Sequence, residues 1–66
     1  MEDKQKILDL LLPALRETRD QHDLVNLQFD PQTETVKVTY ENGSFDVNVR
    51  YDSGIAMIRD VLRAIS

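Results

Sequence analysis

Two runs of alternating apolar and polar residues meet at Asn42-Gly43, and this pattern constrains the fold more than any other feature of the chain. Asn-Gly between such runs is typical of a two-residue hairpin loop in a type I′ turn, which needs positive φ at both central residues. The loop fixes the register of the two strands. It predicts that apolar residues face apolar partners and polar residues face polar ones: Tyr40 with Phe45, Val38 with Val47, Val36 with Val49, Glu41 with Ser44, Thr39 with Asp46 and Lys37 with Asn48.

A third strand is predicted before this hairpin. Val25, Leu27 and Phe29 alternate with polar residues, as expected of a strand with one buried face. The segment 30–33, Asp-Pro-Gln-Thr, follows as a turn, because proline presets φ at its second position and aspartate favours its first. The polar face of all three strands predicts an antiparallel sheet with one side in water.

Residues 3–21 are predicted to form an amphipathic helix. Its apolar face comprises Ile7, Leu8, Leu11, Ala14, Leu15 and Thr18. Pro13 leaves two alternatives, since an interior proline removes a hydrogen bond, whereas a proline in the first turn is tolerated. The helix either runs through Pro13 with a kink or begins there. We favour the first, because the apolar face keeps its phase across Pro13 and the carbonyl of Asp9 can bond to water.

A second helix is predicted to begin after Asp52 or Ser53, either of which can cap it by accepting hydrogen bonds from the first turn. Its apolar face comprises Ile55, Ile58, Val61, Leu62 and Ile65. Both helices are expected to cover the apolar side of the sheet. We therefore predict an α+β fold of order α-β-β-β-α, a two-layer sandwich with a three-stranded antiparallel sheet and both helices on one face.

Length and charge limit the roles open to this chain. Its 66 residues are expected to form a single domain over 1–66, and a domain of this size buries only about 60% of its unfolded surface. Without cysteine it has no disulfide or thiolate metal site. A net charge of −4 disfavours nucleic acid and anionic membranes, and apolar runs such as Leu10-Leu11-Leu12 are too short to span a bilayer. We expect a cytoplasmic protein without a cofactor.

The predicted order of elements resembles that of the double-stranded-RNA-binding domain in topology alone. That family carries a lysine cluster at the start of its last helix, where this chain has Asp-Ser-Gly-Ile-Ala-Met over 52–57. Its Gly-Pro-His-type loop between the first two strands is replaced here by 30–34, Asp-Pro-Gln-Thr-Glu. Nucleic-acid binding is therefore kept as an alternative function, in which Arg59 and Arg63 would contact phosphates.

Few residues suggest catalysis or ligand binding. His22 lies between two aspartates and could act as a base or metal ligand, but a histidine near a helix end is also favoured by the helix dipole. Ser53-Gly54 could bind a small anion, but a single glycine is a weak signal for this and helix capping is the favoured explanation. The carboxylates of Asp9, Glu17, Asp20 and Asp23 are expected on the surface, and the rings of Tyr40, Phe45 and Tyr51 in the core or at its rim. We predict no enzymatic activity and no metal.

The apolar surplus on the two helices suggests an interaction surface instead. Leu10 and Leu12 border the apolar face of the first helix, and Met57 lies on one flank of the second. A small sheet covers such residues poorly, and exposed apolar area marks association sites, although the helices could also pack these flanks against each other. We predict a non-enzymatic protein–protein interaction or self-association module, most simply a homodimer, with Leu10, Leu12 and Met57 as candidate interface residues.

Overall fold

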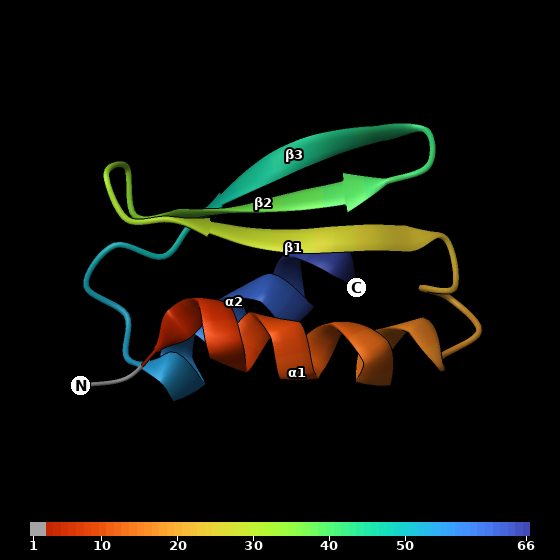
Figure 1. Ribbon diagram of the computed structural model, residues 1–66, viewed down its shortest axis with the longest axis horizontal. Helices are drawn as coiled ribbons and strands as arrows, with labels where there is room; N and C mark the ends of the chain where they lie inside the picture. The colour runs from red at the N-terminus through yellow and green to blue at the C-terminus, as the bar shows by residue number, and fades with distance from the viewer. Residues whose placement is uncertain (1–2) are drawn as a thin grey trace.

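A computed structural model describes residues 3–66 of the chain. Its elements are α1 (Lys4–Arg16), β1 (Leu24–Asp30), β2 (Thr35–Tyr40), β3 (Gly43–Asn48) and α2 (Gly54–Ile65). The strands form one antiparallel sheet in the order β1-β2-β3, and both helices lie on the same side of it (Figure 1). The predicted fold class is confirmed.

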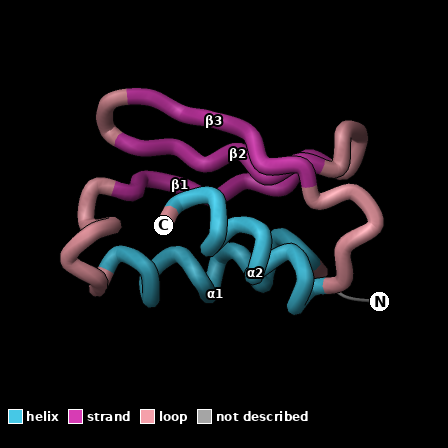
Figure 2. The backbone as a smooth tube through the Cα atoms, turned by 180° about the vertical axis from the view of Figure 1, so that it is seen from behind, coloured by secondary structure: helices cyan, strands magenta, loops and turns pink. Residues whose placement is uncertain are grey.

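The two helices divide the sheet between them. α1 packs against β1, while α2 contacts α1 and β3, and seen from behind α2 lies in front of α1 (Figure 2). The core between the layers consists of Leu8, Leu15, Leu24, Leu27, Val36, Val38, Val49, Met57 and Val61. Within residues 3–66, neither helix combines the length and the apolar character needed to cross a membrane.

α1 runs through Pro13, as the favoured alternative predicted, but ends sooner than expected. Asp3 caps its first turn by accepting a hydrogen bond from the backbone N–H of Lys6. The helix was predicted to reach residue 21, yet its last helical residue is Arg16. After it, the N–H groups of Glu17 and Thr18 bond to carbonyls only three residues back. This tightening ends the α-helical pattern, and Thr18, predicted on the apolar face, is exposed.

The hairpin between β2 and β3 forms in a register two residues away from the predicted one. Val38 faces Phe45 rather than Val47, and Tyr40 faces Gly43. The loop therefore consists of Glu41 and Asn42, and Gly43 is the first residue of β3. Within residues 3–66 no glycine has a positive φ, so Gly43 does not occupy the type I′ turn position that was predicted for it. A slip of two residues keeps every side chain on its predicted face, which is why the apolar side still meets the helices.

Two further elements present different residues to the core than predicted. The register of β1 shifts between Leu24 and Asn26, so Leu24 is buried and Val25 points outward. α2 is rotated about its axis relative to the predicted face. Met57 is therefore fully buried, while Ile55 and Leu62, predicted to be inside, have 73% and 38% of their surface exposed.

Candidate interaction surface

The outer edge of β1 is covered by the side chain of Gln5. Its amide nitrogen donates to the carbonyl of Leu27 at 3.1 Å and to the carboxylate of Asp9 at 2.8 Å. Its amide oxygen accepts from the backbone N–H of Phe29 at 2.8 Å. One side chain thus satisfies two backbone groups that face away from β2, in the way that a neighbouring strand would.

The outer edge of β3 has no neighbouring strand, since β3 is the last strand of the sheet. The N–H of Val49 donates to the carbonyl of Glu34 at 3.0 Å, which fixes the phase of the β2–β3 ladder. Because bonded and non-bonded pairs alternate in an antiparallel ladder, the odd-numbered residues of β3 bond to β2. The backbone N–H and C=O groups of Ser44, Asp46 and Asn48 therefore point outward along this edge.

Two exposed apolar side chains of α2 lie away from this edge. Ile55 and Leu62 are seven residues apart in α2, so they share one flank of the helix. α1 and α2 run in the same direction beneath the sheet (Figure 1). Gln5 lies on the flank of α1 that faces the outer edge of β1, and Ile55 and Leu62 lie on the matching flank of α2, which faces α1 rather than β3. Phe45, 40% exposed, projects from β3 toward the helices.

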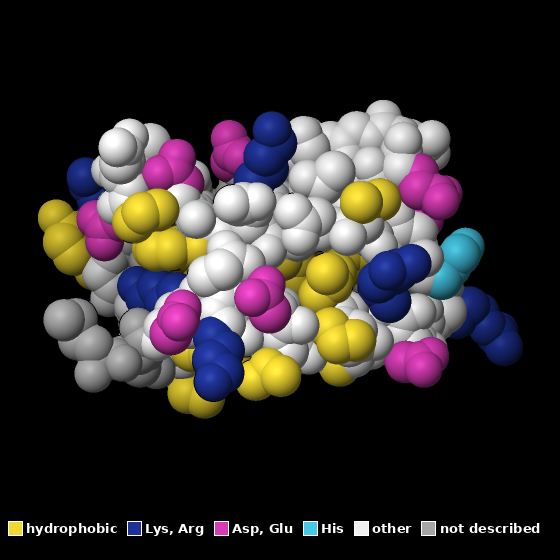
Figure 3. All heavy atoms as spheres, viewed as in Figure 1, with side chains coloured by type: hydrophobic (Ala, Val, Ile, Leu, Met, Phe, Trp, Pro, Cys, Tyr) yellow, Lys and Arg dark blue, Asp and Glu magenta, His cyan; other side chains and the backbone are white. Residues whose placement is uncertain are grey.

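We call this region the β3–α2 surface and define it by the outward backbone of Ser44, Asp46 and Asn48 and the side chain of Phe45. The face seen in Figure 3, over α1 and β1, is different in character. There, apolar side chains lie interspersed with charged ones. The β3–α2 surface instead combines unpaired backbone groups with an exposed aromatic ring, a composition that suits strand addition.

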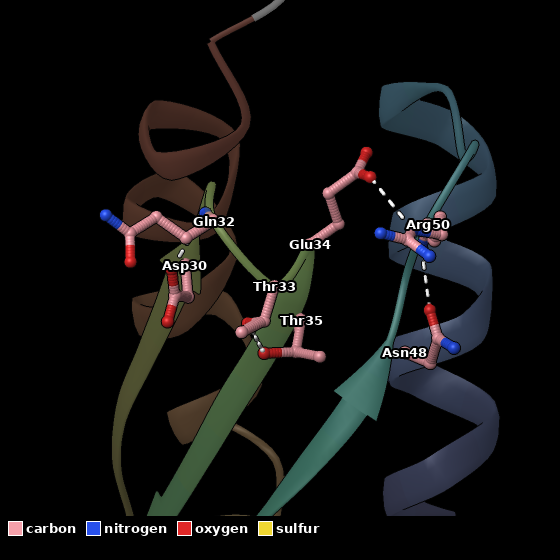
Figure 4. A network of polar contacts seen from close by, with 7 residues as sticks. All are labelled: Asp30, Gln32, Thr33, Glu34, Thr35, Asn48 and Arg50. Carbon is pink, nitrogen blue, oxygen red and sulfur yellow. Dashed lines mark hydrogen bonds and ion pairs between the residues drawn. The ribbon is translucent and has the colours of Figure 1, made fainter.

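A strained corner lies where the chain leaves β3. The N–H of Asp52 bonds to the carbonyl of Val49 at 3.0 Å, closing a turn in which Tyr51 has a φ of 67° and a side chain that is 90% exposed. Glu34, with a φ of 54°, accepts a hydrogen bond from Arg50 Nε at 3.1 Å (Figure 4). Positive φ in a bulky residue is unfavourable, so both positions store strain at the end of the β3–α2 surface.

The three predicted interface residues have different positions. Leu10 is 68% exposed on the solvent side of α1. Leu12 is partly buried and packs against the core, and Met57 lies wholly within the core and offers no surface to a partner. Ile55 takes the exposed position on α2 that was assigned to Met57. Hydrophobic periodicity does not predict this exchange, because almost every position near the start of α2 is apolar.

The other candidate residues have local partners or lie apart from one another. The ring nitrogen Nδ1 of exposed His22 is 2.8 Å from the carbonyl oxygen of Arg19. Ser53 caps α2, its hydroxyl accepting from the N–H of Ala56 at 3.2 Å. Among residues 3–66, no three histidine or acidic side chains gather closely enough to hold a metal ion. Arg59 and Arg63 are exposed on α2.

Two groups have perturbed acidities. The pKa of Tyr40 is raised by burial and by the charge of Asp23, and its hydroxyl donates to the side chain of Gln21. Gln21 in turn donates to the carbonyl of Ile65 at 3.1 Å. This chain of bonds ties β2 to the end of α2, which gives Tyr40 a structural role.

The second group is the carboxyl of Asp52. Its pKa is raised first by a hydrogen bond with the carboxyl group of Asp60, then by burial and by the charge of Asp60, while Lys4 and Arg59 act in the opposite direction. The oxygen Oδ2 of Asp52 is buried without a hydrogen-bond partner. Two adjacent carboxyl groups that resist ionising together explain the direction of the shift.

Comparison of the chain with protein-family models, with curated proteins and with solved structures gives no match.

Proposed function

We propose that this domain is a non-enzymatic protein–protein interaction module that binds an extended strand along β3. The observation that carries the proposal is the open edge of β3 beside the exposed ring of Phe45. A strand added there would form main-chain hydrogen bonds with Ser44, Asp46 and Asn48, and its alternate side chains would lie beside Phe45. We also propose a cytoplasmic location, with which the lack of cysteine agrees.

The strained corner supports the same role. Tyrosine and arginine are enriched among the residues that dominate binding energy at interfaces. The guanidinium carbon of Arg50 lies 5.8 Å from the centroid of the Tyr51 ring, so the ring is held at the surface although it contributes little to the core. Backbone strain that is kept for an exposed side chain is typical of a functional position.

A synthetic peptide with alternating valine and threonine residues, flanked by lysines, tests this proposal. Added to ¹⁵N-labelled protein, it should shift the amide resonances of Ser44, Asp46 and Asn48 in NMR spectra. Asp46→Pro should abolish these shifts, since it removes an outward N–H group and leaves the ladder to β2 intact.

Leu10→Glu is the matched control, because Leu10 is an exposed leucine outside the β3–α2 surface. Binding to this variant should be unchanged. Resonances away from β3 report whether Asp46→Pro is folded, and Ser44→Pro, which removes another outward N–H group and is also expected to weaken binding, provides a second variant if it is not. Shifts confined to other faces, or no shifts at millimolar peptide, would contradict the proposal.

A further inference from the structure

We infer that the helical face of this domain, meaning the side of α1 and α2 that points away from the sheet, binds the same face of a second copy of the chain. The two copies are related by a two-fold axis that runs along the helices, so α1 of each copy packs on α2 of the other. This inference goes beyond the proposed function, because the helical face does not include the open edge of β3.

Exposed apolar side chains lie on this face, along the line where the two helices meet. Leu10 follows the buried Leu8 by two residues, a rotation of about 200° that turns it away from the sheet. Ile55 and Leu62 are exposed on the flank of α2 that faces α1. In Figure 3 apolar side chains reach the lower margin of the molecule, which is the helical face. Exposed apolar area of this kind marks an association surface.

The alignment of the helices determines which residues of two copies would meet. α1 and α2 run side by side in the same direction (Figures 1 and 2), and Gln21, just after α1, bonds to the carbonyl of Ile65 at the end of α2. With a rise of 1.5 Å per residue, Leu10 stands about 9 Å from the start of α1 and Leu62 about 12 Å from the start of α2. Rotation about an axis along the helices preserves these levels, so Leu10 of one copy meets Leu62 of the other.

The charges of the two helices are complementary in this arrangement. Arg59 and Arg63 each follow a buried residue of α2 by two positions, so both point away from the core and are exposed. Glu17 follows the buried Leu15 by two positions and is exposed on the same side of α1. Along the helix axis, Arg63 of one copy lies about 6 Å from Glu17 of the other, a difference that two long side chains bridge. Each dimer contains this pair twice.

A two-fold axis across the helices is disfavoured by the same charges. It would pack α2 on its own copy in antiparallel orientation, with Arg59 close to Arg59 of the second copy. It would also pack α1 on its own copy, and with Leu10 at the centre Asp3 would face Glu17. Like charges repel at such separations. With the axis along the helices, Lys6 is turned toward the flank of Gln5, away from the arginines of the second copy.

The size of the helical face indicates a weak dimer. The domain measures 31 × 20 × 18 Å, and Figure 1 is viewed down the shortest of these axes with the sheet above the helices, so the helical face spans 31 by 18 Å. Two such faces in contact would bury on the order of 1,000 Å² in total, at the lower limit of specific interfaces. Interfaces of this size are typical of transient complexes, so we expect the dimer to dissociate at micromolar concentrations.

Sedimentation velocity of the full chain over about 1–200 µM tests the dimer. Wild-type protein should shift from monomer to dimer across this range. Leu10→Glu should raise the dimer dissociation constant by about tenfold or more, because it places a charge in the centre of the contact. Val25→Glu is the matched control, since Val25 is an exposed apolar residue that points away from the helices, and should leave the constant unchanged. A monomer at every concentration, or a dimer weakened by Val25→Glu and not by Leu10→Glu, would overturn the inference.

Charge reversal tests both the second copy and its orientation. Arg63→Glu alone sets two glutamates against each other at both contacts, and Glu17→Arg alone sets two arginines against each other. Each variant should therefore dimerise about fivefold more weakly than wild type. In a one-to-one mixture, the two introduced charges face each other at one contact, and the unaltered Arg63 and Glu17 face each other at the second. The mixture should regain the wild-type dissociation constant; a mixture as weak as the separate variants would refute the axis along the helices.

The proposal for β3 and the proposal for the helical face can fail separately. Leu10→Glu should weaken the dimer and leave peptide binding at β3 unchanged. If the peptide shifts the β3 resonances but the chain stays monomeric, the strand-binding function stands and a second copy is excluded from the helical face. If the chain dimerises as described and the peptide does not bind, the strand-binding function alone fails.

Discussion

Tyr51 adopts a backbone conformation that suits glycine better than tyrosine. It occupies the third position of the turn from Val49 to Asp52 with a φ of 67°, and a left-handed conformation costs an L-residue roughly 1 kcal/mol. We expect Tyr51→Gly to be more stable than Tyr51→Ala by about 1 kcal/mol in urea unfolding, because both lack the ring and only alanine keeps the Cβ. Equal stability of the two variants would show that the turn is not strained.

The carboxyl pair of Asp52 and Asp60 makes stability depend on pH. Because the pKa of Asp52 is higher in the folded chain than in the unfolded chain, the folded state binds the proton more tightly. Its contribution to stability is present at low pH and is lost as the pH rises through the folded-state pKa. Asp52→Asn should therefore raise the urea midpoint at pH 7, and its advantage over wild type should shrink toward pH 4.

Asp60→Asn relieves the same repulsion and should raise the urea midpoint at pH 7 in the same way. The double variant Asp52→Asn/Asp60→Asn should raise the midpoint by less than the sum of the two single increases. A lower midpoint for Asp52→Asn at pH 7 would mean that its carboxylate stabilises the fold instead.

At the scale of the element, Gln5 couples α1 to β1 through two hydrogen bonds, one to Leu27 and one from Phe29. Gln5→Ala would leave the N–H of Phe29 and the carbonyl of Leu27 without this partner. We expect a loss of about 1–2 kcal/mol in unfolding free energy and faster hydrogen exchange at the Phe29 amide, measured by NMR. Gln5→Glu keeps the oxygen acceptor and should preserve that protection, so equal exchange in both variants would contradict the bonding described.

The hairpin register makes a prediction at Gly43. Its φ is not positive, and a Cβ added there meets no atom within 4 Å. Gly43→Ala should therefore raise the unfolding free energy by about 0.4–1 kcal/mol by reducing the entropy of the unfolded chain. In the type I′ turn predicted from the sequence, the same substitution would cost about 1 kcal/mol. The sign of the change, measured by urea unfolding, distinguishes the two registers.

These elements also show what the sequence can and cannot predict. Alternation fixes the face of each strand, but a slip of two residues preserves alternation, so Val38 could face Phe45 or Val47 with the same pattern. In α2 the apolar arc is wide enough that Met57 and Ile55 could exchange places. The cover provided by Gln5 leaves no sequence signal, because it depends on the distance between α1 and the edge of β1 rather than on periodicity.

The interaction surface was therefore predictable only in part. Surplus apolar residues on the helices indicated association. The residues named for it were Leu10, Leu12 and Met57, of which Met57 is buried. Which backbone groups of β3 point outward depends on the register of the β2–β3 hairpin. Alternation of apolar and polar residues does not determine that register, so the outward position of Ser44, Asp46 and Asn48 could not be predicted.

At the scale of the whole molecule, size and association are linked. A chain of 66 residues in which nine of the described residues form the core has a small margin of stability, and a partner that binds only the folded state adds to it. For a dimer, tenfold more protein adds about 0.7 kcal/mol per chain, which shifts the melting temperature of a domain this small by roughly 3–5 °C. Calorimetry of the wild-type chain should show this shift with concentration, whereas a melting temperature that does not depend on concentration would show that the chain does not self-associate.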